Sequence, residues 1–460
     1  MLKAMRSAAV LVGLLLCSSP SFAEVQNVRV NGDVTVRGFF RSNLDLHDER
    51  SSQAGLDSEN FFMSTTGINI GADLTENVST FLRIVNERDW DSTSTAEAGN
   101  DIDLSQAYIS LKELFYSPLT LRLGTQPIVW GRGFVLGSNL LPSVNSIGND
   151  RNASITANEY TDFTAFDAIR ATLDLSNVGG LTLPLTADYV HIKIDENDVG
   201  SADDVTLHGV NFSTQFDTAK AEMDVYYLNE REKNSATATN DNHGSTNTLG
   251  LRGSAQPSDA TYVYGELAYQ FGERGIDPAG VLAGGKQQAW ATNLGAEYTL
   301  ANLTSQPMLG GEWRFYSGTN LDDGAAGGWN PAAPGYFRTA IREFQTQSTV
   351  AGFYPNDQAD VTTAQTNQHE LAVYGSFSPI EDLVVSPRLA WFFLDEDAIP
   401  VAGAKGESYL GIEWDTQVLY DYTDDVQLGL LYALFAPGNV FRTPNDASAQ
   451  QLVTTVSVKF

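Results

Sequence analysis

QQLVTTVSVKF, residues 450–460, is the stretch that decides the fold of this chain. Its even positions from 452 onward are Leu, Thr, Val, Val and Phe, whereas its odd positions from 455 onward are Thr, Ser and Lys. Alternation with a period of two residues is typical of a β-strand that has one face in an apolar environment. The stretch therefore predicts an amphipathic strand at the end of the chain.

The chain ends on an aromatic residue, Phe460, inside this predicted strand. That ending is similar to the C-terminal signal by which outer-membrane barrels are recognised for insertion. A soluble β-sandwich can also end on a strand, so the choice between the two depends on the rest of the chain. A membrane barrel requires segments of about ten residues with the same alternation, separated by turns.

Such segments recur along the chain and predict about 18 strands. Their approximate spans are 32–43, 62–73, 78–88, 104–112, 118–126, 167–176, 184–193, 205–216, 219–229, 247–256, 261–271, 288–300, 307–317, 368–378, 383–394, 409–422, 426–435 and 450–460.

The connections between these segments alternate in length. Those after even-numbered strands are short, whereas those after odd-numbered strands are longer and polar, and two are very long, 127–166 and 318–367. A barrel with both termini in the periplasm has this pattern. We therefore predict an all-β fold, a transmembrane antiparallel up-and-down β-barrel with short periplasmic turns and long extracellular loops. The loop 318–367 either folds into the pore or shields the barrel from outside.

The start and the charge of the chain restrict its location and partners. Residues 1–23 have the layout of a signal peptide, with two basic residues before a short apolar run and a cleavage site after Ala23. Removing Lys3 and Arg6 takes the net charge from −30 to −32. This acidity argues against nucleic acid as a partner, because phosphate binding requires lysine and arginine. We expect the outer membrane of a Gram-negative bacterium, with its lipid and lipopolysaccharide as partners.

The residues that catalysis or metal binding would require are scarce. Cys17 is the only cysteine and lies in the predicted signal peptide, and the five histidines form no metal-binding spacing. No G-x-S-x-G stretch is present. We therefore expect no enzyme activity, no cofactor and no metal site.

Arginines recur on the polar side of the predicted strands, which an aqueous lumen would face: Arg37, Arg83, Arg122, Arg170, Arg252, Arg314 and Arg388. Acidic residues, Glu413 and Asp415 among them, share that side. Opposed basic and acidic walls would set a transverse field that selects ions. Alternatively, the charges are ion pairs that brace a wide barrel. The pattern does not choose between these two roles.

Three segments resemble the alginate-export family of outer-membrane barrels. They are LTLRLGTQPIVWGRGFVLG at 119–137, FDAIR at 166–170, and LGIEWDTQVLYDYTDDVQLGLLYALFAPG at 410–438. The resemblance implies an 18-stranded channel that passes an acidic polysaccharide or sugar acids outward through a constriction with lumen arginines. The positions that match such arginines are Arg122, Arg132, Arg170 and Arg314, and the same segments contain Gln126, Trp130, Glu413 and Asp415.

These observations predict a pore for hydrophilic, anionic sugars or polysaccharide. Two alternatives stay open: a general porin of other specificity, and a barrel that sheathes the cytochrome of an electron conduit. A periplasmic partner for export or for electron transfer is the corresponding expectation.

Overall fold

The computed structural model of the 460-residue chain describes most of it. The described residues are 27–44, 46, 58–90, 102–115, 118–138, 155–176, 180, 183–195, 204–234, 242–273, 286–319, 327–333, 335, 338–343, 365–398, 406–441 and 446–460. The predicted signal peptide, residues 1–23, lies outside them and stays a prediction.

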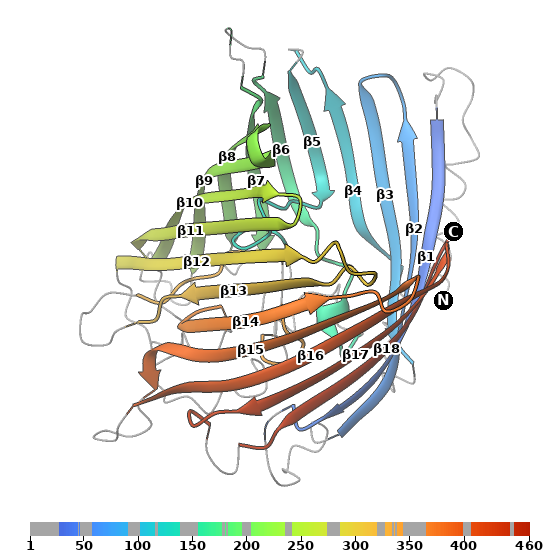
Figure 1. The fold of residues 1–460 in the computed structure, drawn as a ribbon. Helices are drawn as coiled ribbons and strands as arrows, with labels where there is room; N and C mark the ends of the chain where they lie inside the picture. Colours follow the sequence, from blue (N-terminus) through green and yellow to red (C-terminus); the bar gives the residue numbers. More distant parts are fainter. Residues whose placement is uncertain are drawn as a thin grey trace.

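Eighteen strands form a single sheet (Figure 1). In chain order they are β1 (Asn27–Ser42), β2 (Ser58–Asp73), β3 (Val78–Asp89), β4 (Asp103–Lys112), β5 (Leu119–Gln126), β6 (Phe166–Asp174), β7 (Leu185–Asp195), β8 (Val205–Phe216), β9 (Ala221–Asn234), β10 (Asn242–Ser258), β11 (Thr261–Glu273), β12 (Lys286–Thr299), β13 (Met308–Tyr316), β14 (Gln368–Ser376), β15 (Leu383–Ala398), β16 (Glu407–Thr423), β17 (Val426–Pro437) and β18 (Ala449–Lys459).

Each strand pairs antiparallel with its neighbours in the chain, and β1 pairs with β18 to close the barrel. The closing register places Asp33 opposite Lys459 and Phe40 opposite Leu452. The two ends of the described chain therefore lie together, as Figure 1 shows. Closure removes the unpaired edges that an open sheet would present to lipid. The predicted barrel class and strand number are confirmed.

The short connections lie at one end of the barrel and the long ones at the other, as predicted. The β8–β9 turn is longer than the sequence indicated, because Ala219 and Lys220 adopt left-handed φ angles of 56° and 44° and delay the start of β9 to Ala221. This turn contains the 3-10 helix η3 (Thr218–Lys220), and a second one, η2 (Asn158–Tyr160), lies in a long loop. No helix among the described residues is long and apolar enough to cross a membrane.

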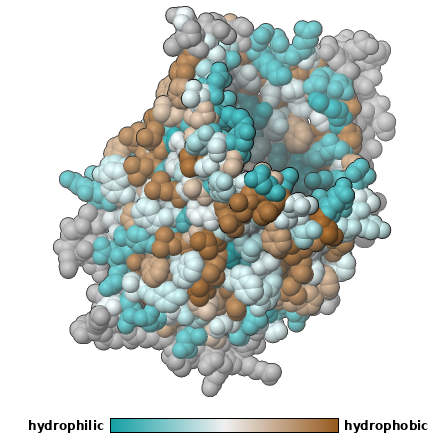
Figure 2. Space-filling view, in the orientation of Figure 1, coloured by the Kyte–Doolittle hydropathy of each residue, from teal (hydrophilic) through white to brown (hydrophobic). Residues whose placement is uncertain are grey.

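The two faces of the strands differ as the alternation predicted. On β10, Leu251 is 51% exposed on the outer face, whereas Arg252 is 8% exposed on the inner face. On β16, Trp414 is 48% exposed, whereas Glu413 is 1% exposed. Figure 2 shows hydrophobic residues spread over the outer surface of the strands in front and a hollow bordered by hydrophilic residues at the upper right. Apolar side chains therefore face the bilayer, where an exposed charge would be unfavourable.

The inner face is not polar throughout. In the half of the barrel that carries the long loops, β7 directs Val190 and Ile192 inward, and both are fully buried. Leu207 of β8 and Phe392 of β15 are buried inside in the same way. These residues form the wall against which the two longest loops pack, so the long-loop half of the lumen holds apolar clusters.

Candidate functional site

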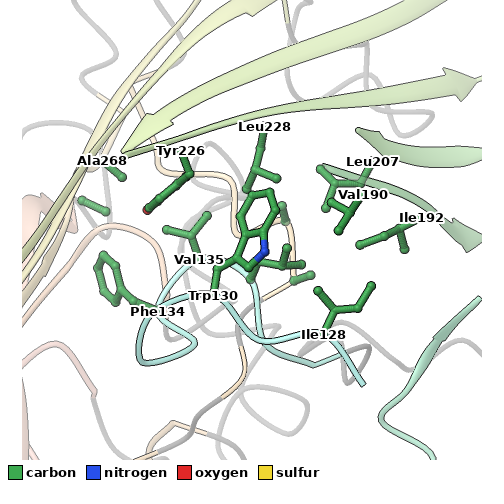
Figure 3. Packing of buried hydrophobic residues seen from close by; sticks show 14 of the residues in the cluster. Ile128, Trp130, Phe134, Val135, Val190, Ile192, Leu207, Tyr226, Leu228 and Ala268 are labelled. Carbon is green, nitrogen blue, oxygen red and sulfur yellow. The ribbon is translucent and has the colours of Figure 1, made fainter. Parts of the chain in front are cut away.

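Residues 127–138 and 155–165, which lie between β5 and β6 in the chain, enter the barrel, and we call them the first inward loop. Figure 3 shows Trp130 of this loop beside Leu228 on the inner wall. The Trp130 indole N–H donates to Asp188 Oδ2 at 2.9 Å, and the Arg170 Nε donates to Asp188 Oδ1 at 2.9 Å. Asp188 therefore accepts hydrogen bonds from a loop residue and from a wall arginine, and this shared acceptor anchors the loop inside the barrel.

The predicted site residue Gln126 has a structural role at the start of this loop. Its side chain is fully buried, and its amide nitrogen donates to the carbonyl oxygens of Arg122, Gly124 and Ala168 at 3.0–3.2 Å. Gly124 has a φ of +116°, and a Cβ there would lie 2.2 Å from the Ala107 carbonyl oxygen. In the G-x-Q motif, the glycine thus allows the backbone turn that ends β5, and the glutamine holds the chain where it turns inward.

The far end of the first inward loop returns along the inner faces of β1 and β3. Arg83 bridges the loop and the wall: its Nε donates to Asp162 at 2.6 Å and its Nη1 to Asp33 at 2.8 Å. The guanidinium of Arg37 lies 4.8 Å from the centre of the Tyr160 ring. Burial raises the pKa of Tyr160, so its hydroxyl stays protonated beside this arginine.

The described residues between β13 and β14, which are 317–319, 327–333, 335, 338–343 and 365–367, form the second inward loop. Residues 338–343 are its best-anchored part. Glu413 of β16 accepts from the backbone N–H groups of Ile341 and Arg342, both at 2.7 Å. Asp415, on the same strand, accepts from the Ala340 N–H at 3.2 Å. Two wall carboxylates thus hold three successive backbone donors, so these predicted residues position a loop.

A buried ion cluster supports the same loop. Glu343 pairs with Arg314 at 2.6 Å, and Arg314 also contacts Glu370. Arg388 bridges Glu370 at 2.5 Å and Glu312 at 3.1 Å. Burial raises the pKa of Glu343, although the nearby arginines oppose that shift. The cluster agrees with the bracing role that the sequence left open, because each of these two wall arginines is shared between two carboxylates.

The two inward loops join each other across the barrel. Leu136 and Ala333 form a parallel β-bridge, and the Gly137 N–H donates to the Ala333 carbonyl at 2.8 Å. The Gly335 N–H donates to the Gly133 carbonyl at 2.7 Å. A Cβ on Gly137 would lie 2.7 Å from the Gly335 Cα, so the contact requires residues without side chains. The described parts of the second loop therefore lie inside the pore, which decides between the two roles considered for it.

Beside this junction lies a cavity of about 650 Å³. Its lining includes three arginines and four carboxylates, so the carboxylates exceed the arginines by one. These residues are Arg132, Arg338, Arg388, Glu159, Glu297, Glu312 and Asp415. Arg132 lies 3.9 Å above the Tyr264 ring, and the hydroxyls of Tyr264 and Tyr374 are 3.2 Å apart. Burial lowers the pKa of Arg132, but the tyrosines and Glu297 outweigh it and raise that pKa overall.

The remaining wall charges are distributed unevenly around the lumen. Arg37 and Arg122 project from β1 and β5, and within the described residues neither forms an ion pair within 4 Å. Glu87, Glu159 and Asp162 nevertheless interact with Arg37 electrostatically. Arg122 instead lies 4.6 Å above the Tyr108 ring. By contrast, Arg252 on β10 is neutralised by Asp224 at 2.6 Å and Glu222 at 3.2 Å. The pairing of the wall arginines therefore differs from one side of the lumen to the other.

The structure thus separates the residues singled out from the sequence into groups. Arg132 and Arg388 line the cavity with Asp415, and Arg37 and Arg122 project into the lumen elsewhere. The others hold loops or brace the wall: Arg83, Gln126, Trp130, Arg170, Arg252, Arg314 and Glu413. The partners of Asp188, Glu312 and Glu370 were not predictable from the alternation.

These features define an outer-membrane channel, a closed barrel with an apolar outer face, charged inner walls and two loops that narrow its lumen. The family comparison agrees with that class. The chain belongs to the alginate export family, because the model of that family matches residues 23–455. No curated protein sequence matches the chain significantly.

Solved porin structures share this fold. OccK2 (OpdF) of Pseudomonas aeruginosa, in complex with glucuronate, is similar with a TM-score of 0.54 at 12% identity, covering 95% of this chain and 98% of that one. A BenF-like porin of Pseudomonas fluorescens Pf-5 gives 0.54 at 12%, covering 95% and 100%. OccAB1 of Acinetobacter baumannii gives 0.55 at 10%, covering 96% and 99%. At these identities the likeness establishes the fold alone.

Proposed function

We propose that this pore passes anionic sugars or the polysaccharide built from them. The observation that carries the proposal is the repeated placement of an arginine over a tyrosine ring along the lumen. The pairs are Arg37 with Tyr160, Arg122 with Tyr108, Arg132 with Tyr264, and Arg388 with Tyr374, at 3.9–5.4 Å.

The chemistry of such a pair suits a sugar acid. A guanidinium binds a carboxylate through two parallel hydrogen bonds, and a tyrosine offers an apolar ring face together with a polar hydroxyl. Because the pairs occur on several strands, a chain of uronate units would find successive contacts. Membership of the alginate export family supports the same substrate class, and the glucuronate bound to OccK2 gives a probe of suitable chemistry.

Liposome swelling tests the proposal directly. Liposomes containing the pore should swell faster in glucuronate than in glucose, and the double variant Arg37→Gln/Arg122→Gln should lose that preference. Arg88→Gln is the matched control, because Arg88 projects from the outer face of β3 and is exposed. Equal swelling of the unaltered pore in the two sugars would contradict the proposal.

A general porin that prefers cations is the second candidate, and one observation favours it. The cavity beside the loop junction is lined by four carboxylates against three arginines. A reversal potential in a salt gradient separates the two candidates, because its sign reports whether anions or cations cross more readily. A cation preference that persists with sodium glucuronate would favour the second.

A further inference from the structure

The outer face of β7 to β12 carries a row of six side chains at one height, four aromatic and two aliphatic. The register places Tyr189, Val210, Tyr227, Leu249, Tyr269 and Trp290 side by side, each on the next strand. Tyr189, Tyr227 and Trp290 are 41–47% exposed. Tyrosine and tryptophan gather where hydrocarbon meets the headgroups, so this row marks the outer interface of the bilayer. We call it the tyrosine row.

The next positions toward the extracellular end are polar. His191 of β7 lies opposite His208 of β8, and their Nδ1 atoms are 3.1 Å apart. On the following strands Asn229 and Asn247 continue the row, and the Asn229 amide donates to Asn247 at 3.0 Å. His191, His208 and Asn247 are partly exposed on this lipid-facing surface, whereas Asn229 is buried among them. Exposed polar groups would be unfavourable in hydrocarbon, which places this row among the headgroups.

Two residues further toward the extracellular end, two cations lie on the same surface. Lys193 of β7 and Arg231 of β9 flank Thr206 of β8, which pairs with both in the register. Arg231 Nε donates to Asn229 at 2.9 Å, which leaves its two terminal nitrogens for another acceptor. Among the described residues, neither cation forms an ion pair within 4 Å, and the nearest carboxylate in the register is Asp167, opposite Lys193. Asp167, opposite Lys193 on β6, accepts from the Thr125 hydroxyl at 2.5 Å.

We propose that this surface binds the phosphorylated headgroup of an outer-leaflet glycolipid. Lys193 and Arg231 are two strands apart, about 10 Å, so their long side chains can converge on one phosphate above the Thr206 hydroxyl. Four residues along each strand separate these cations from the tyrosine row, about 13 Å before allowing for strand tilt. The acyl chains of the lipid would then lie against the tyrosine row while its phosphate reaches the cations.

The occupant is assigned as a lipid because of the surface around the cations. A free phosphate would need only the two cations and the hydroxyl. The site, however, continues without interruption into exposed rings that face the bilayer, and only an amphipathic ligand satisfies both parts. The His191–His208 pair lies between the two parts and offers ring nitrogens to the glycan.

Binding of bisphosphorylated lipid A tests the proposal, measured by native mass spectrometry on the pore in neutral-lipid nanodiscs. Lys193→Gln/Arg231→Gln should weaken binding about thirtyfold, as expected for two cations near a charged headgroup. The matched control is Lys286→Gln, because Lys286 lies at the same height on β12, opposite Glu273 and three strands away from Arg231. Dephosphorylated lipid A should bind the unaltered pore as weakly as the phosphorylated lipid binds the double variant.

Three results would overturn the proposal: equal binding by the double variant, equal binding of the dephosphorylated lipid, or saturation of the site by inorganic phosphate. Heat-modifiable mobility on gels verifies that each variant is a folded barrel. Conductance should be unchanged in all of these variants, because every altered side chain lies outside the lumen. The result is therefore independent of the proposed substrate of the pore.

Discussion

Replacement of Glu413 by alanine should release the second inward loop from the lumen wall. Glu413 accepts two backbone hydrogen bonds at 2.7 Å, from Ile341 and Arg342. Hydrogen bonds to a charged group contribute about 1.5–3 kcal/mol each, so the two hold the loop by about 3–6 kcal/mol. Because about 1.4 kcal/mol corresponds to a factor of ten, the undocked fraction should rise at least about a hundredfold.

Single-channel recordings in planar bilayers measure this release. Glu413→Ala should give a larger mean conductance with frequent fluctuations, since an undocked loop widens and intermittently blocks the lumen. Glu413→Gln retains one acceptor oxygen and should fall between the two. Asp421→Asn is the control, because it removes a charge from the same strand near the short-turn end, away from the loop. A folded Glu413→Ala barrel with unchanged conductance and noise would refute the assignment of Glu413 as the anchor.

Three more predictions concern the loops and β5. Trp130→Ala should remove about 3–5 kcal/mol of packing from the first inward loop and make it sensitive to external protease, and a loop as resistant as before would contradict the packing described. Gly124→Ala should lower the yield of folded barrel on gels, whereas Gly71→Ala, where a Cβ meets open space, should not. In the docked loop, burial raises the pKa of Glu343 by more than the nearby arginines lower it, so docking is strongest below the pKa of a solvated glutamate and weakens as pH rises through the docked value. Conductance noise should therefore increase with pH, and Glu343→Gln should reduce that dependence.

The barrel was predictable because lipid requires every strand to alternate apolar residues on its outer face with polar residues on its inner face. On β16 the alternation placed Trp414 and Glu413 on opposite faces, and the structure has them there. The turn pattern was equally informative, since short and long connections must alternate in an up-and-down barrel. Only the bounds differed, as at β10, where pairing continues to Asn242 and Ser258 because backbone hydrogen bonds need no apolar face.

The candidate site was less predictable, because its contacts join segments that have no periodicity. Nothing in the sequence around Trp130 indicates Asp188 as its partner, and nothing near Gly137 indicates Gly335. On β7 the alternation gives the period but not the inward face, because Val190 is buried inside and His191 faces outward. Where loops line the lumen, both faces are partly apolar, and the sequence alone does not identify the face that meets lipid.

The pairing of β1 with β18 has a consequence for biogenesis. The seam joins the first and last strands of the barrel, so the wall stays open along one edge until both strands have entered the membrane. A chain clipped before Ala449 would leave β17 and β1 with bare backbone groups facing each other across a gap. A copy without β18 would therefore have no sealed state to reach in the membrane.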